Sequence, residues 1–255
     1  MLDLATLSQA LGANACRFDA ELLPVCASTN AELIARAEAG APSGSVVIAA
    51  SQTAGRGRRG RTWLSAPGDS LTFSLLWRFA PGTMPLGLSL AAGLALAHAL
   101  TKLGAGRTAL KWPNDVLKDD KKLAGILVEL VPGATHAAVI GLGLNLRLPA
   151  ALPAEVRETA AALDMPVDAN SLLAAILAEL RTVLDIFAAT GFAGLRADWG
   201  ALDAFQDLPV RLLSDFAPPR DGICRGVDVD GALLLETDGC IERILSGEIS
   251  LRRAA

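Results

Sequence analysis

Hydrophobic positions follow helical spacing over two long segments of the chain. Residues 86–103 and 171–189 are rich in leucine, isoleucine and alanine, and each is followed by a glycine within two residues. This pattern predicts two buried helices. A third helix is expected at 31–39, since Ser28-Thr29-Asn30 provides a start signal and Gly40 a stop signal. A fourth, short helix is expected at 192–204.

Shorter apolar runs, bounded by glycine, proline or charged residues, predict strands. Before residue 150 they lie at 45–51, 71–79, 108–112, 123–131 and 137–146. Pro132-Gly133 joins the last two and predicts a hairpin. Strand and helix do not alternate strictly, so the expected class is α+β, with a mixed, largely antiparallel sheet and helices.

The pattern changes after Asp207. Short apolar segments at 210–213, 223–229, 232–236 and 240–244 alternate with Gly, Pro and Asp turns. Such spacing is typical of a small β-barrel. We therefore predict two domains, residues 1–206 and residues 207–255.

Composition narrows the possible functions. Hydrophobic residues make up 52% of the 255-residue chain, which argues against disorder, and the net charge of -4 argues against a nucleic-acid-binding module. Glycines, His98 and Lys102 interrupt the apolar segment at 86–103, so a buried helix fits it better than a membrane span, and no signal peptide is expected. The four cysteines form no CxxC pair, and we expect buried thiols in a reducing cytosol.

Gly55 to Arg61 forms an arginine–glycine loop after the strand at 45–51. Its first six residues match G-x-G-x-x-G, but no helix is predicted to follow, so a dinucleotide-binding Rossmann unit is rejected. Arg56, Arg58, Arg59 and Arg61 repel one another, and we expect a mobile loop until a phosphate orders it. A solvated basic turn is the alternative; Trp63, directly after the loop, favours a functional one.

Three further clusters contain candidate chemistry. Lys111-Trp112-Pro113-Asn114-Asp115 is predicted to lie at the end of a strand, and Lys122 to Gly125 opens the next one. Gly141-Leu142-Gly143-Leu144-Asn145 lies in an apolar strand that its glycines weaken, so we expect something to pack against them, as a flat ligand would against Gly125. Each cluster alone has an ordinary structural explanation.

Taken in order, these segments resemble the biotin–protein ligases, also called biotin–acetyl-CoA-carboxylase ligases. The resemblance rests on Ser28 to Asn30, Gln52, Gly55 to Gly60 with Trp63, Lys111 to Asp115, Lys122 to Gly125, Gly141 to Asn145 and the final Ser246 to Arg252. It implies a catalytic domain similar to class II aminoacyl-tRNA synthetases and a small SH3-like C-terminal barrel. It also implies a two-step reaction, in which biotin and MgATP give biotinyl-5′-AMP and the biotinyl group then moves to a lysine.

The resemblance assigns roles to numbered residues. The catalytic candidates are Arg56, Arg58, Lys111 and Lys122. The biotin-binding candidates are Ser28, Thr29, Asn30, Gln52, Gly55, Arg56, Gly57, Arg58, Asp115, Lys122, Gly125 and Gly143. The nucleotide-binding candidates are Arg58, Arg61, Trp63, Lys111, Asn114 and Asn145, with Trp63 covering the adenylate and Asn145 reading adenine. Asp115 either accepts from the ureido N–H groups or helps to hold Mg²⁺; the metal ligands stay unknown, and neither His98 nor His136 is a convincing general base.

The implied partner is a biotin carboxyl carrier domain of a biotin-dependent carboxylase, in the cytoplasm. No DNA binding is expected, because the 27 residues before Ser28 are too few for a helix-turn-helix with its own core. No membrane partner is expected, and a homodimer stays open because many relatives pair through their central sheet. The rivals are a lipoate or octanoate ligase, a nucleic-acid-binding module and a non-enzymatic biotin sensor.

Overall fold

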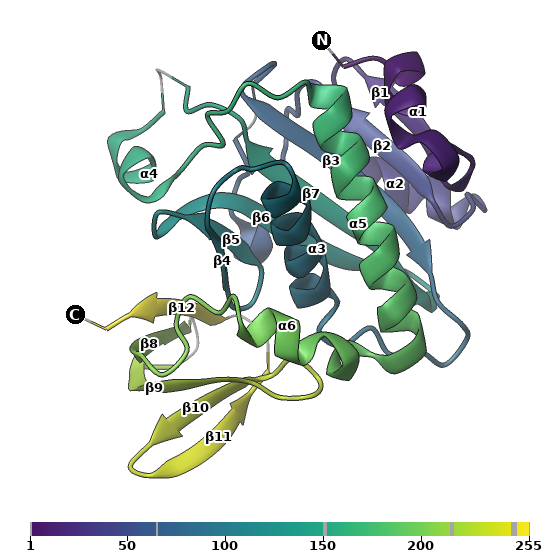
Figure 1. Ribbon diagram of the computed structural model, residues 1–255. Helices are drawn as coiled ribbons and strands as arrows, with labels where there is room; N and C mark the ends of the chain where they lie inside the picture. The colour runs from purple at the N-terminus through teal and green to yellow at the C-terminus, as the bar shows by residue number, and fades with distance from the viewer. Residues whose placement is uncertain (1, 65, 150–151, 215–216, 246–248, 255) are drawn as a thin grey trace.

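The computed structural model describes residues 2–64, 66–149, 152–214, 217–245 and 249–254, which form a large sheet with helices and a smaller C-terminal sheet (Figure 1). The large sheet has seven strands in the spatial order β1 (Asp19–Leu23), β2 (Ser45–Ala49), β3 (Ser70–Arg78), β7 (Ala134–Asn145), β6 (Lys121–Val131), β5 (Asp115–Lys118) and β4 (Thr108–Lys111). Within the described residues, β1 and β2 are its one parallel pair. The predicted α+β class and the β6–β7 hairpin are confirmed.

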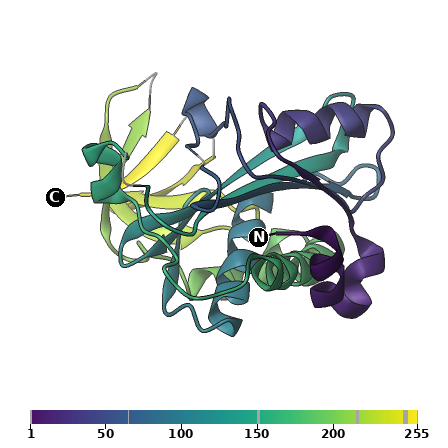
Figure 2. The same ribbon diagram turned by 90° about the horizontal axis from the view of Figure 1, so that it is seen from above.

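One face of this sheet carries the main core. Helices α3 (Leu88–Lys102) and α5 (Ala169–Thr190) lie side by side below it in Figure 2. Phe73 and Ile140 point to this face and are fully buried in the same apolar cluster as Leu94 and Leu177. Complete burial of each such side chain contributes about 1.5–3 kcal/mol, so this layer fixes the sheet on which the opposite face is built.

The opposite face is covered in part by α2 (Thr29–Glu38). Leu33 packs there against Val47, Leu76 and Val139 in a second, smaller core. Ser28 is the residue before the helix and has extended backbone angles, as its start signal predicts. Thr29 and Asn30 therefore lie in the first helical turn, at the edge of the part of the sheet that α2 leaves uncovered.

Several short elements were not predicted. They are α1 (Leu4–Leu11), the 3₁₀ helix η1 (Gly12–Arg17), β1, β5, α4 (Ala154–Thr159) and β12 (Ile249–Arg253). The helix expected at 192–204 is wrong in detail, because a 3₁₀ turn, η3 (Phe192–Leu195), precedes a single α-helical turn, α6 (Arg196–Gly200).

The C-terminal strands form a five-stranded antiparallel sheet, which confirms the small β-unit. Its spatial order is β11 (Cys240–Ile244), β10 (Leu233–Thr237), β9 (Arg220–Val227), β8 (Pro209–Ser214) and β12. The buried Trp112 indole N–H donates to the carbonyl of Gly231 over 3.0 Å and so ties this sheet to the large one. The division between residues 206 and 207 stays a prediction.

In the described part of the chain, no helix has both the length and the apolar character needed to cross a membrane. All four cysteines are free thiols. The expectation of burial is confirmed for Cys224 and is wrong for Cys16 and Cys240, which are exposed.

Candidate active site

A pocket lies on the face of the large sheet opposite α3 and α5. The start of α2, the arginine–glycine loop, the turn after β4 and the C-terminal strand β12 surround it. Most predicted site residues line it: Ser28, Thr29, Asn30, Gln52, Arg56, Gly57, Arg58, Arg61, Trp63, Lys111, Asn114, Asp115, Lys122, Gly125 and Gly143. Segments separated by more than two hundred residues in the sequence thus share one cavity.

Two glycines of β7 leave room for side chains to pack directly against the backbone at the floor of the pocket. A Cβ on Gly143 would stand 2.3 Å from the Trp63 ring, and a Cβ on Gly141 would stand 2.1 Å from Asn30 Oδ1. Both distances are too short for a real Cβ contact, so a larger residue at either glycine would displace the Trp63 ring or the Asn30 side chain. The prediction that something packs against these glycines is confirmed, and the groups are side chains of the protein itself.

The arginine–glycine loop folds into a compact turn over this floor. Gly57 N donates to Arg61 O over 2.7 Å, and Trp63 N donates to Gly55 O over 2.9 Å. Between these bonds lies η2 (Arg58–Gly60), a single 3₁₀ turn followed by extended chain. The absence of an α-helix after the glycines agrees with rejection of a Rossmann unit. The mobility of the loop stays a prediction.

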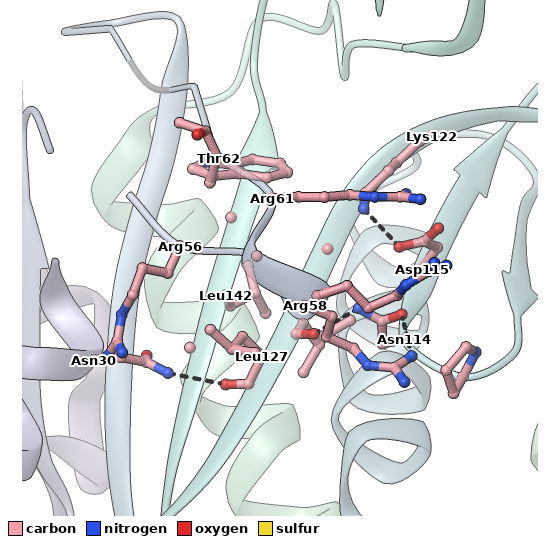
Figure 3. Close-up of a pocket in the computed structure, with 18 of the residues that line it drawn as sticks. Asn30, Arg56, Arg58, Arg61, Thr62, Asn114, Asp115, Lys122, Leu127 and Leu142 are labelled. Atoms are coloured by element: carbon pink, nitrogen blue, oxygen red, sulfur yellow. Dashed lines mark hydrogen bonds and ion pairs between the residues drawn. The ribbon is translucent and has the colours of Figure 1, made fainter. Parts of the chain in front are cut away.

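A cluster of three charges lies at one end of the pocket (Figure 3). Asp115 Oδ1 lies 2.6 Å from Lys122 Nζ, and its Oδ2 lies 3.5 Å from Lys111 Nζ. Burial alone would raise the pKa of Asp115, but Lys122 and Lys111 together hold it below its ordinary value. Burial lowers the pKa of Lys111, and the Asp115 carboxylate opposes that shift. Asp115 is therefore ionised, and it fixes both ammonium groups beside the pocket.

Two arginines border this cluster. The Arg58 guanidinium donates to Asn114 Oδ1 over 3.3 Å, while Asn114 Nδ2 donates to the Ile126 carbonyl over 2.8 Å. Arg252, from β12, was not predicted; its burial, reinforced by the charge of Arg61, lowers its pKa. Nothing local marks Arg252 as a site residue, because only the packing of the C-terminal sheet brings β12 to the pocket.

The other end of the pocket is polar and buried. Thr29 N donates to Gln52 Oε1 over 2.7 Å, and the side chains of Ser28, Thr29 and Asn30 are at most 5% exposed. Thr72 was also not predicted, and its Oγ1 is buried without a hydrogen-bond partner in the described chain. Such an atom indicates a place where a bound molecule would complete the hydrogen bonding.

Two predicted residues lie outside the pocket lining. Gly55 supports the loop, since a Cβ there would stand 2.4 Å from Trp63 O. Asn145 Nδ2 donates to the carbonyls of Lys122 and Ala161, over 3.4 and 3.0 Å, and so anchors the segment after α4. Its reading of adenine stays a prediction. Across the described ranges, no three His, Cys, Asp or Glu residues come together as a metal site.

Comparison with known proteins extends these observations to the whole chain. A model of the biotin/lipoate A/B protein ligase family matches residues 22–145, and a model of the biotin protein ligase C-terminal domain matches residues 210–252. The bifunctional ligase/repressor BirA of Escherichia coli is 43% identical over 239 residues, which cover 91% of this chain and 74% of that protein. The biotin–[acetyl-CoA-carboxylase] ligase of Mycobacterium tuberculosis is 36% identical, over 94% of this chain and 92% of the relative.

Solved structures of biotin protein ligases have the same fold as this chain. A biotin protein ligase from Aquifex aeolicus, in complex with biotin and ATP, superposes with a TM-score of 0.81 at 31% identity. The alignment covers 92% of this chain and 99% of the other. Sequence, fold and pocket thus lead to one conclusion: the chain belongs to the biotin/lipoate A/B protein ligase family and, within it, to the biotin protein ligases.

Proposed function

We propose that the pocket of this ATP-dependent biotin protein ligase binds both substrates and catalyses two steps, formation of the adenylate and transfer of the biotinyl group. In the first, a biotin carboxylate oxygen attacks the α-phosphorus of ATP, the bond to the bridging oxygen breaks, and pyrophosphate leaves biotinyl-5′-AMP behind. In the second, a lysine amine of a biotin carboxyl carrier domain attacks the acyl carbon. AMP then leaves with the bonding electrons, and the amine loses its proton as the amide forms.

The excess of cations in the pocket carries this proposal. Asp115 is the one acidic residue among the described lining residues, and two lysines already neutralise it. Arg58 and Arg252 add positive charge around the same space. A carboxylate must approach a polyanionic triphosphate in the first step, and fixed cations offset that repulsion and the charge that develops on the leaving group.

The arrangement suggests which end holds which substrate. The buried Ser28 and Thr29 and the half-buried Gln52 offer donors and acceptors suited to the ureido ring of biotin, and the buried Asn30 lies beside them. Lys122 lies 5.9 Å from the centre of the Trp63 ring and is ion-paired to Asp115, between the two ends. We therefore assign Lys122 to the reacting carboxylate and α-phosphate.

We assign binding of the remaining phosphates and of the nucleotide to the residues at the charged end of the pocket. These are Arg58, Arg61, Lys111, Asn114 and the unpredicted Arg252, with Trp63 covering the adenylate. Closure of the arginine–glycine loop over that reactive mixed anhydride would limit its hydrolysis.

Mg²⁺ would enter as part of the MgATP substrate. Asp115, the one carboxylate among the described lining residues, is held between two ammonium groups, which does not suit a protein-built Mg²⁺ cage. Mg²⁺ commonly keeps several waters and binds through substrate phosphates. We assign it no protein ligand and expect the lysines to act on the phosphates directly.

A biotinylation assay tests the two-step reaction. Purified protein, ATP, Mg²⁺, labelled biotin and a biotin carboxyl carrier domain should give pyrophosphate and label on the carrier lysine; labelled lipoate should give neither. Transfer of lipoate with no transfer of biotin would contradict the proposal.

We place the reaction in the cytoplasm, where ATP and carboxylases meet. The oligomeric state is a separate question, and sedimentation velocity would distinguish a monomer from a homodimer.

A further inference from the structure

A continuous hydrogen-bond chain runs beneath the polar end of the pocket. It begins at Gln52, whose Oε1 accepts from Thr29 N over 2.7 Å. The fully buried Ser74 Oγ lies 2.7 Å from Thr29 Oγ1 and donates to Asn30 Oδ1 over 2.5 Å. Ser74 does not line the pocket, so it supports Thr29 and Asn30 from below.

The chain continues through Asn30 to the arginine–glycine loop. Asn30 Nδ2 donates to the Leu127 carbonyl over 3.1 Å, as Figure 3 shows, and to Glu129 Oε2 over 2.7 Å. Both amide hydrogens are thereby used, and Oδ1 is directed at Ser74. The same Glu129 oxygen lies 3.1 Å from Arg56 Nη2, so one carboxylate oxygen holds a buried amide and the first arginine of the loop.

The geometry of the sheet explains why the Glu129 side chain reaches both Asn30 and Arg56. Side chains at every second position of a strand share one face, so Gly125, Leu127 and Glu129 of β6 all point to the pocket side. Gly125 and Leu127 line the pocket, and Glu129 follows beyond its edge. The Glu129 side chain is 27% exposed and belongs neither to the charged end of the pocket nor to its lining.

We propose that Glu129 is a positioning residue that couples the biotin end of the pocket to the arginine–glycine loop, by holding Asn30 and Arg56 in fixed relation. The inference rests on the proposed function, because it takes Asn30 and Arg56 as biotin-side groups. Loss of the Glu129 charge weakens its hold on Arg56 at the pocket rim, and loss of the whole side chain would also remove one of the three hydrogen bonds that orient the Asn30 amide. Among the described residues, Lys111, Lys122 and Arg252 form no hydrogen bond or ion pair with Glu129, so nucleotide binding should not depend on it.

Glu129→Gln is the informative variant, since glutamine keeps the size and an acceptor for Asn30 but loses the charge that binds Arg56. Loss of a charge-assisted hydrogen bond should raise the KM for biotin and speed dissociation of biotinyl-AMP by about tenfold, with the KM for ATP and kcat within about twofold of wild type. Glu129→Asp, which keeps the charge, should recover part of the loss. The matched control is Glu179→Gln, which breaks the ion pair to Lys102 on the far side of the sheet and should change none of these values.

A double-mutant cycle separates positioning from general structural damage. In an Arg56→Ala background, Glu129→Gln should add at most about twofold to adenylate dissociation, because the partner is already gone. Full additivity, an unchanged KM for biotin in Glu129→Gln, or tighter biotin binding would overturn the inference. Biotin affinity of wild type and Glu129→Gln, measured by calorimetry, tests the coupling even without turnover; failure of wild type to release pyrophosphate would instead count against the proposed function.

Discussion

The two sheets of the molecule use charge in opposite ways. On the small sheet, arginines form surface ion pairs with one or two carboxylates each, as in Arg211–Asp221, where both side chains are more than half exposed. In the pocket of the large sheet, the side chains of Lys111 and Asp115 are 13% and 15% exposed, and cations outnumber the one carboxylate among the described lining residues. The ion pairs of the small sheet are hydrated, whereas the charges of the pocket are largely desolvated and carry an excess of positive charge.

The two arrangements differ in how much electrostatic free energy they can contribute to ligand binding. Exposed ion pairs gain little, because water and salt screen them and the side chains lose rotamer freedom. Buried cations cost desolvation free energy, and an anion that enters the site recovers part of it. The pocket therefore depends on its substrates to complete its charge balance, and the small sheet does not.

The largest expected effect comes from removing a cation at the pocket centre. Lys122→Ala should slow pyrophosphate release by about 10²–10³-fold, the usual consequence of losing one group that stabilises developing charge. Lys121→Ala is the matched control, since Lys121 is the exposed neighbour on the same strand and should retain normal turnover. Near-normal rates for Lys122→Ala would show that the pocket charge does not act on the chemical step.

Arg58 should have a smaller effect, limited to the phosphate-bearing intermediate. Arg58→Ala is expected to speed biotinyl-AMP release by about tenfold while leaving the affinity for free biotin within about twofold, since free biotin carries no phosphate. Stopped-flow dissociation and calorimetry measure the two quantities. Equal weakening of biotin and adenylate would assign Arg58 to biotin alone.

Asp203 offers a third arrangement, a half-buried carboxylate that forms no ion pair within the described part of the chain. It lies where the chain passes from α6 to the small sheet, and its oxygens accept from Phe205 N and the Cys224 thiol. Burial raises the pKa of Asp203 from 3.8 to about 6. The folded protein keeps the proton up to about pH 6, whereas the unfolded chain releases it near 3.8, so this group lowers stability as pH rises between those values and costs most above pH 6.

Asp203→Asn removes that ionisation. Because each tenfold change in an ionisation constant equals about 1.4 kcal/mol, we expect the variant to raise the free energy of unfolding by about 3 kcal/mol at pH 8 and to change it little at pH 4. Urea unfolding at the two pH values measures this. Asp198→Asn, at an exposed position on α6, should be neutral at both; a gain for Asp203→Asn that is equal at pH 4 and pH 8 would point to packing instead of charge.

The smallest effect belongs to the exposed pairs. Arg211→Ala together with Asp221→Ala should move the melting temperature by less than about 2 °C and leave ligation unchanged. Differential scanning calorimetry in low and high salt is the check. A shift of several degrees would mean that the two sheets differ less than their exposures indicate.

The main helices and the paired strands were predictable, because their hydrophobic period and stop signals are local. β5 was missed because Asp115–Lys118 has only four residues with a charge at each end, and β12 because five residues with two arginines do not stand out. The pocket residues between Ser28 and Gly143 were found as motifs. Glu129, Ser74 and Arg252 were missed because each matters only through a partner distant in sequence.

The main helices, most strands, the α+β class and the clusters of arginines and lysines could be predicted from the sequence alone, since spacing and residue type are properties of short segments. Tertiary structure decided which charges meet. It paired Lys122 with Asp115, laid Trp63 on Gly143, brought Arg252 from the second sheet, and turned Asn145 toward backbone carbonyls. These contacts follow from strand register and the docking of two sheets, which depend on the whole core and which no short segment encodes.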